Sequence, residues 1–86
     1  MNIKGLEFIC TCGACPEQYD VFKDGKQVAY VRLRWGHLFC EYPDVFGECI
    51  YDYSFGDAFL GHFPDEEERK YHLDKIADKI LEKIGG

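Results

Sequence analysis

Hydrophobic and polar residues alternate along much of residues 17–53, and this period of two predicts β-strands joined by short turns. Residues 3–10 predict a first strand. A cysteine-rich loop over residues 11–16 follows, because Gly13 and Pro16 interrupt regular structure. Residues 17–22 and 27–34 then predict a β-hairpin around the turn Asp24-Gly25.

The register of this hairpin depends on the length of its turn. A two-residue turn places Tyr19 opposite Tyr30, whereas a three-residue turn with Gly25 in a bulge places Tyr19 beside Ala29. We favour the three-residue turn, because it joins Tyr19 and Val21 to the more apolar face of the next strand.

Two further hairpins extend that apolar face. A tight turn at Trp35-Gly36 pairs residues 29–34 with residues 37–42. A four-residue loop over residues 43–46 then pairs Cys40 with Cys49 and sets Glu41 opposite Glu48. The side chains expected on the apolar face are Ala29, Val31, Leu33, Leu38, Cys40, Tyr42, Tyr51 and Tyr53. Residues 58–63 are a further candidate strand, which the pattern does not orient.

The end of the chain predicts a helix over residues 65–84. Asp65 and Glu68 form a capping-box-like start directly after Pro64, and Gly85-Gly86 ends the helix. The apolar residues at helical spacing are Leu73, Ile76, Ala77, Ile80 and Ile84. This stripe and the apolar face of the sheet need mutual cover, so we expect an α+β fold, an antiparallel meander of four or five strands with one C-terminal helix on one face.

The length of 86 residues predicts a single domain over residues 1–86. We divide it into a cysteine-rich N-terminal segment (1–16), the meander (17–63) and the C-terminal helix (65–84). The composition, 47% hydrophobic and 16% aromatic with three prolines, is typical of a folded chain rather than a disordered one.

Charge is distributed unevenly along the chain. Residues 1–43 carry five acidic and five basic residues, so the net charge of −6 comes from the second half. The segment from Asp44 to Glu68 has eight carboxylates and neither Lys nor Arg. Such a protein presents an anionic surface to its partners. Four of the eight, residues 65–68, have a simpler role at the start of the helix, where negative charge is favoured.

The sequence predicts a cytoplasmic protein, because it has neither a membrane-length apolar stretch nor a secretory leader pattern. In a reducing compartment, five cysteines indicate free thiols or a metal site rather than disulfides. Cys12 and Cys15 have the spacing of a zinc ligand pair, and with Cys40 and Cys49 they complete a candidate zinc set. Three readings stay open, namely free thiols without a cofactor, zinc, and thiol redox chemistry at Cys12 or Cys15.

Other chemistry has simpler explanations. His37 is expected beside Arg34 and Asp52, an arrangement that serves general base catalysis in a cleft and is a charge pair in solvent. Arg32 is expected to stack on Phe39, and two arginines give weak affinity for nucleic acid in so acidic a protein. We therefore expect a binding protein rather than an enzyme.

Five segments also carry a resemblance to known sequences: Cys15-Pro16-Glu17-Gln18-Tyr19-Asp20-Val21, Tyr30-Val31-Arg32-Leu33-Arg34, Glu41-Tyr42-Pro43-Asp44, Glu48-Cys49-Ile50-Tyr51 and Glu66-Glu67-Glu68-Arg69. In these segments the chain resembles a family of short uncharacterised proteins from bacteriophages and prophages. The resemblance covers most of residues 15–84, leaves out Cys10 and Cys12, and implies no catalytic residues. It implies a phage context, in which small acidic proteins bind and block host machinery, as anti-CRISPR and other anti-defence proteins do.

The leading hypothesis is a small acidic protein that docks on a basic surface of a host protein. The expected contact residues are Asp44, Glu48, Asp52, Asp57, Glu41, Trp35, Phe39 and Phe46. A zinc-stabilised structural module and a thiol-dependent redox protein are the alternatives. An unprotected sheet edge also leaves homodimerisation open.

Overall fold

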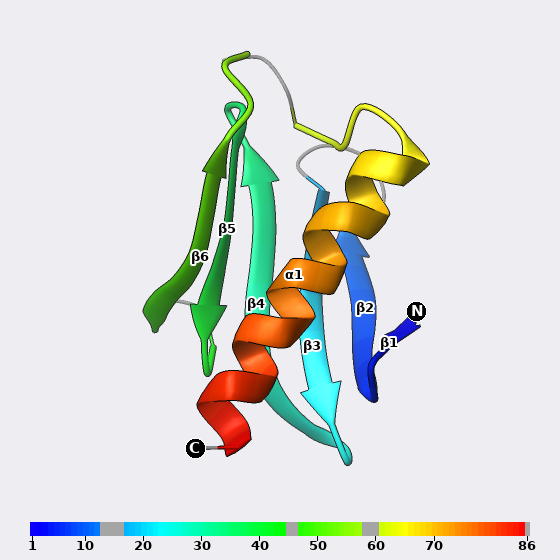
Figure 1. Ribbon diagram of the computed structural model, residues 1–86, viewed down its shortest axis with the longest axis vertical. Coiled ribbons are helices and arrows are strands. Elements are labelled where there is room, and N and C mark those ends of the chain that lie inside the picture. Colours follow the sequence, from blue (N-terminus) through cyan, green and yellow to red (C-terminus); the bar gives the residue numbers. More distant parts are fainter. Residues whose placement is uncertain (13–16, 45–46, 58–60, 86) are drawn as a thin grey trace.

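In the described part of the chain, six antiparallel strands form one sheet in the order β1-β2-β3-β4-β5-β6, and a helix covers one face (Figure 1). The computed structural model describes residues 1–12, 17–44, 47–57 and 61–85, without the side chain of Cys12. The elements are β1 (Asn2–Ile3), β2 (Leu6–Cys12), β3 (Glu17–Lys23), β4 (Lys26–Arg34), β5 (His37–Tyr42), β6 (Glu48–Ser54) and α1 (Glu66–Gly85). The predicted α+β meander with a C-terminal helix is confirmed, with more strands than expected.

An N-terminal hairpin accounts for the additional strand. Where the sequence predicted one strand over residues 3–10, a turn at Lys4-Gly5 separates β1 from β2. Both turn residues have positive φ, 54° and 87°, as a type I′ hairpin turn requires. Both residues of the turns Asp24-Gly25 and Trp35-Gly36 also have positive φ.

The register of β3 against β4 combines a correct prediction with a wrong one. The turn has two residues, since Lys23 pairs with Lys26, so the predicted three-residue turn is wrong. Between Phe22 and Val21 the register shifts by one residue. Phe22 pairs with Gln27 and Val21 pairs with Ala29, so Val28 of β4 has no partner in β3 and forms a bulge. Tyr19 and Val21 therefore join the apolar face as predicted, through a bulge within the strand.

Strands β4 and β5 pair as predicted, with Arg34 opposite His37 and Leu33 opposite Leu38. The predicted pairing of β5 with β6 is wrong. Cys40 lies opposite Tyr51, and the loop before β6 has five residues because Tyr42 pairs with Glu48. The loop includes Gly47, where an added Cβ atom would clash with the Tyr42 carbonyl oxygen.

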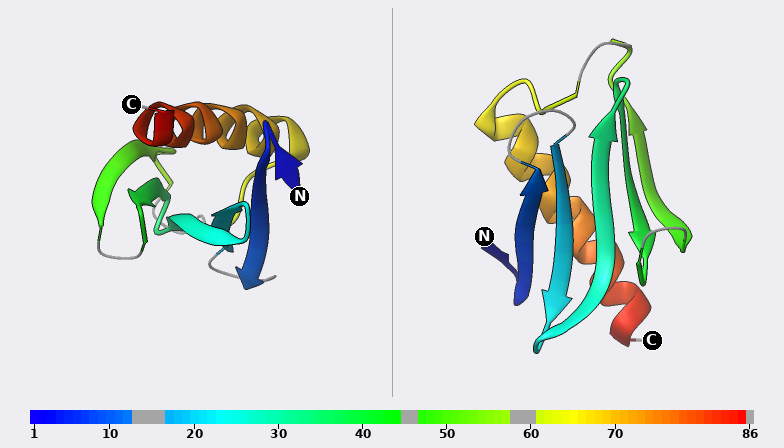
Figure 2. Two further views of the ribbon diagram at one scale, coloured as in Figure 1. Left: turned by 90° about the horizontal axis from the view of Figure 1, so that it is seen from below. Right: turned by 180° about the vertical axis from the view of Figure 1, so that it is seen from behind.

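Helix α1 lies across the concave inner face of the sheet, which curves around it (Figure 2, left). Its N-terminus is capped as predicted, because the amide of Glu68 donates to Asp65 Oδ1 at 2.8 Å. The buried apolar core comprises Leu6, Phe8, Tyr19, Val21, Ala29, Val31, Leu33, Leu38, Cys40, Phe63, Leu73, Ile76, Ala77 and Ile80. The predicted docking of the helix stripe on the apolar sheet face is therefore confirmed.

The segment between β6 and α1 differs from the candidate strand over residues 58–63. Residues 61–63 are not part of a strand, and residues 58–60 lie outside the described part of the chain. Phe63 is buried against the core, and the amide of Glu17 donates to the Gly61 carbonyl at 2.7 Å. Residues 61–63 lead into the helix, and this hydrogen bond holds them against the start of β3.

Candidate protein-binding surface

Strand β6 forms one edge of the sheet and carries two of the predicted contact residues, Glu48 and Asp52. Asp44 lies in the loop before the strand, and Asp57 follows its end. All four side chains are exposed. We call β6 together with these four residues the acidic edge.

The fold brings cationic and polar groups to this edge, and of these the sequence predicted only His37 beside Asp52. Lys83 of α1 donates to both carboxylate oxygens of Glu48, at 2.9 and 3.0 Å. His37 Nε2 lies 2.7 Å from Asp52 Oδ1, and the amide of Gln27 donates to Asp44 at 3.2 Å. The side chains of Glu48 and Asp52 remain 62% and 63% exposed. Ion pairs this exposed contribute little to stability, so both carboxylates are still accessible to a partner.

The face of the sheet away from α1, here called the outer face, carries most of the other predicted contact residues. Trp35 is 66% exposed at the tip of the β4–β5 hairpin, and the Arg34 guanidinium lies 5.4 Å from its ring centroid. Phe39 is half-buried under Arg32 at 5.8 Å, which confirms the predicted stacking. Phe46 lies outside the described part of the chain.

Of two contacts predicted near the acidic edge, the one between Glu41 and Glu48 is wrong and the one between His37 and Asp52 is confirmed. Glu41 lies opposite Cys49 and not opposite Glu48, so the expected opposition of two carboxylates is wrong. His37 contacts Asp52 as predicted, although their strands pair in a different register. Both partners of this pair are about half exposed, which fits a cross-strand charge pair in solvent.

The candidate zinc ligands lie in different environments. Cys40 is fully buried beneath the helix, and this burial raises the pKa of its thiol to about 12. Cys49 is exposed, and its thiol donates to the Tyr51 carbonyl at 3.3 Å. The side chain of Cys12 and all of Cys15 lie outside what the structure describes. Within the described residues, no three His, Cys, Asp or Glu side chains form a metal-binding group, and the zinc set stays a prediction.

Sequence reasoning missed an aromatic cluster between β6 and α1. Its centre is His72, which is 1% exposed and whose Nδ1 lies 2.8 Å from the Tyr51 hydroxyl. The rings around it belong to Tyr51, Tyr53, Phe55, Phe63 and Tyr71, with centroids between 4.5 and 6.1 Å from that of His72. His72 Nε2 lies 3.2 Å from Glu68 Oε2 but makes no well-aligned hydrogen bond. The i,i+4 spacing of Glu68 and His72 was the available sequence signal.

A buried carboxylate was missed as well. Glu17 is 6% exposed, accepts two hydrogen bonds from Arg69, and accepts one each from the Tyr19 hydroxyl and the Phe63 amide. Burial alone would raise the pKa of Glu17, but these hydrogen bonds together hold it below its usual value. With its oxygens satisfied, Glu17 fastens β3 to the start of the helix.

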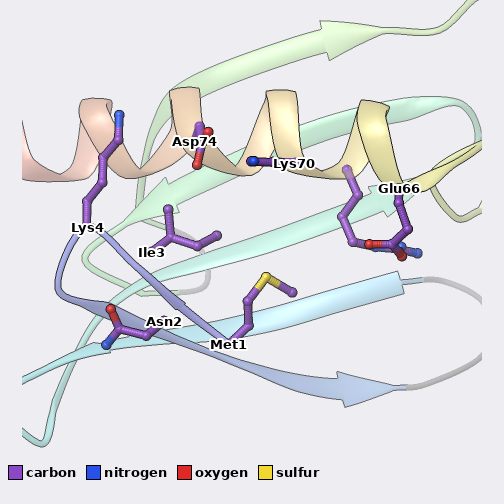
Figure 3. A pocket seen from close by; sticks show the side chains of 8 residues that line it. Met1, Asn2, Ile3, Lys4, Glu66, Lys70 and Asp74 are labelled. Carbon is purple, nitrogen blue, oxygen red and sulfur yellow. The ribbon is translucent and has the colours of Figure 1, made fainter.

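A surface pocket of about 420 Å³ lies at the opposite edge of the sheet, between β1 and α1 (Figure 3). Lys4 and Lys70 line it together with Glu66 and Asp74, so groups of both charges face the same space. The ammonium group of Lys4 is already bonded to Asp78 of α1 at 2.6 Å. Arg69 also lines the pocket and is bonded to Glu17 and Glu66, so Lys4, Arg69 and Glu66 already pair within the chain.

No family model matches the chain, and no match is found among curated proteins or solved structures. The resemblance to short phage proteins therefore stays a prediction. Within the described residues, no helix has the length and hydropathy needed to cross a membrane.

Proposed function

We propose that this protein is a non-enzymatic binding protein that docks its acidic edge on a basic surface of another protein. The observation that carries the proposal is the position of β6, a seven-residue edge strand that bears two exposed carboxylates and no Lys or Arg. Asp44 and Asp57 extend the same charge beyond both ends of the strand. Complementary charge of this kind accelerates encounter and selects among partners.

Contact energy at such an interface comes mainly from a few large side chains. Trp35 supplies one at the hairpin tip, and Phe39 lies on the adjacent strand of the outer face. The resemblance to phage proteins suggests the class of partner, a host protein whose basic surface normally holds nucleic acid. In that setting the protein acts as an anti-defence inhibitor.

Capture from a bacterial lysate tests the proposal when two matched variants are compared. The variant Glu48→Lys/Asp52→Lys reverses two charges on the acidic edge and breaks two exposed ion pairs. The control Glu7→Lys/Asp78→Lys makes the same change in net charge and also breaks two exposed ion pairs, at the β1 edge. We expect a basic protein to be retained at low salt by the wild type and the control, and lost with the acidic-edge variant and at high salt. Equal retention by both variants, or retention that salt does not affect, would contradict the proposal.

A further inference from the structure

We propose that β6 receives an extended basic segment of the partner as a seventh strand, and that a Lys or Arg side chain of this segment lies on Tyr53 and Tyr71. The inference rests on the proposed function and adds how the acidic edge recognises its partner. It is supported separately by the backbone of β6, by the rings beside it and by the charge around them.

The two edges of the sheet differ in the length of backbone that they offer. The edge strand β1 has two residues and pairs only with Leu6 and Glu7 at the start of β2, whereas β6 is a continuous edge of seven residues. Among the described residues, β6 pairs through its backbone with β5, and no backbone hydrogen bond joins residues 48–54 to any other element. Alternate amide and carbonyl groups along such an edge are the groups with which an added strand pairs.

Two exposed tyrosine rings lie beside this edge, and both pack against the buried ring of His72. Tyr53 of β6 is 44% exposed and Tyr71 of α1 is 55% exposed. Both pack on the ring of His72, at centroid distances of 4.5 and 5.0 Å. His72 is buried and in turn contacts the Tyr51 hydroxyl. Because the rings rest on a packed support, binding there costs little side-chain entropy.

The chemistry of this tyrosine pair suits a cation. The ammonium group of Lys75 already lies over the Tyr71 ring, 5.1 Å from its centroid, so one face of that ring holds a cation within the chain itself. The carboxylate of Glu68 lies 3.2 Å from His72 Nε2 with its side chain 45% exposed, which adds negative charge next to the rings. Burial lowers the pKa of His72, so the imidazole is neutral at pH 7 and does not repel an incoming cation.

Charge also favours a basic segment over a second copy of this chain at the same edge. A second copy would bring another Glu48 and Asp52 to the edge, on a protein whose net charge is −6. Opposition of like charges across paired strands is unfavourable, whereas a strand that carries Lys or Arg is attracted.

The test uses acetylated peptides of about ten residues, long enough to span β6. One alternates Lys with Val, a second has the same sequence with every backbone nitrogen methylated, and a third alternates Glu with Val. We expect the Lys peptide to bind, to shift the amide resonances of residues 48–54, and to slow hydrogen exchange at alternate amides of β6. We expect N-methylation to weaken binding at least about tenfold, because it removes the donors of an added strand.

Side-chain variants test the tyrosine pair. Tyr53→Ser/Tyr71→Ser should weaken binding of the Lys peptide about fivefold or more, whereas Tyr53→Phe/Tyr71→Phe, which keeps both rings, should bind as the wild type does. Ile9→Ser removes an exposed apolar side chain from β2, which three strands separate from β6, and is the control. If the serine variant loses its dispersed amide spectrum, the phenylalanine variant and the peptide comparison still decide the matter.

Failure of this inference can be told apart from failure of the proposed function. Equal, salt-sensitive binding of the Lys peptide and its N-methylated form would overturn strand addition and leave docking by charge intact. Binding of the Lys peptide no stronger than that of the Glu peptide would count against both. Dimerisation through β6 without peptide, detected as protected β6 amides together with a doubled mass in sedimentation, would assign the edge to a second copy and overturn the inference.

Discussion

Arg69 of α1 and Glu17 of β3 form an ion pair across 52 positions of sequence, with Arg69 Nε 2.8 Å from Glu17 Oε2. The Glu17 side chain is 7% exposed and that of Arg69 is 23% exposed. The Tyr19 hydroxyl and the Phe63 amide complete the set of donors to the carboxylate. Burial of a charged pair yields little net stability by itself, but loss of one partner leaves the other charge unsatisfied. The pair therefore fixes where the helix starts over the sheet.

Arg69→Met is expected to lower the free energy of unfolding by about 3 kcal/mol, because it leaves a buried carboxylate without its cation. Glu17→Gln keeps the volume and removes the charge, so it should cost about half as much. Urea unfolding measures both changes. The double variant should lose less free energy of unfolding than the two single variants lose together, because it leaves no buried charge without a partner. Additive costs would show that the two residues act independently.

Asp65 caps the helix that this ion pair positions, through its bond to the Glu68 amide. Asp65→Ala is expected to lower the free energy of unfolding by about 1 kcal/mol, because an amide of the first turn loses its acceptor. Asp65→Asn retains a capping side chain and is the matched control, with an expected change of a few tenths of a kcal/mol. Equal losses in the two variants would assign the effect to charge rather than to capping.

Turn chemistry explains which parts of the fold could be predicted from the sequence. The β4–β5 register was predicted correctly because a two-residue turn ending in Gly36 fixes the pairing of all that follows. The β5–β6 register was not, because the five-residue loop moves every partner by one position, and a shift between Cys49 and Tyr51 moves the partners of residues 37–40 by one more. Tyr51 points to the inner face in either register, so the pattern of apolar residues does not reveal the shift.

The candidate site was predictable only where it depended on residues close in sequence. The exposed acidic residues of β6 and the exposed Trp35 followed from local pattern and turn position. The Lys83 partner of Glu48 is 35 positions away, and the Arg69 partner of Glu17 is 52 away, so local periodicity carries no sign of either. The aromatic shell of His72 depends on how β6 packs against α1, which a sequence pattern does not specify.

Trp35 occupies a backbone conformation that bulky residues rarely adopt, with φ of 56° in the β4–β5 turn. Trp35→Asn is expected to raise the free energy of unfolding by about 1 kcal/mol, because asparagine tolerates the left-handed region. Asp24→Asn, at the corresponding position of the β3–β4 turn with φ of 53°, should change it little. Thermal unfolding measures both. A destabilised Trp35→Asn would mean that the stacking of Arg34 on the indole outweighs the backbone strain.

Burial lowers the pKa of His72, against the opposing effect of Glu68. The unfolded chain therefore binds a proton near the ordinary histidine pKa of about 6.5, where the folded protein does not. Stability from this group is present above that pH and is lost as the pH falls through it towards the lower folded value. We expect the free energy of unfolding to rise as the pH rises through about 6.5, with a smaller slope in His72→Asn, which keeps an acceptor for the Tyr51 hydroxyl. An equal slope in the variant would contradict this assignment.

The cysteines give a test that also separates free thiols from zinc. Cys40 is fully buried with its thiol pKa raised to about 12, whereas Cys10 and Cys49 are exposed. Because the thiolate is the reactive form, iodoacetamide at neutral pH should label Cys10 and Cys49 in the folded protein, and Cys40 only after unfolding in urea. Peptide mass spectrometry identifies the labelled sites. In a zinc-bound protein, Cys49 would instead resist labelling until a chelator is added, and this result would favour the predicted ligand set over free thiols.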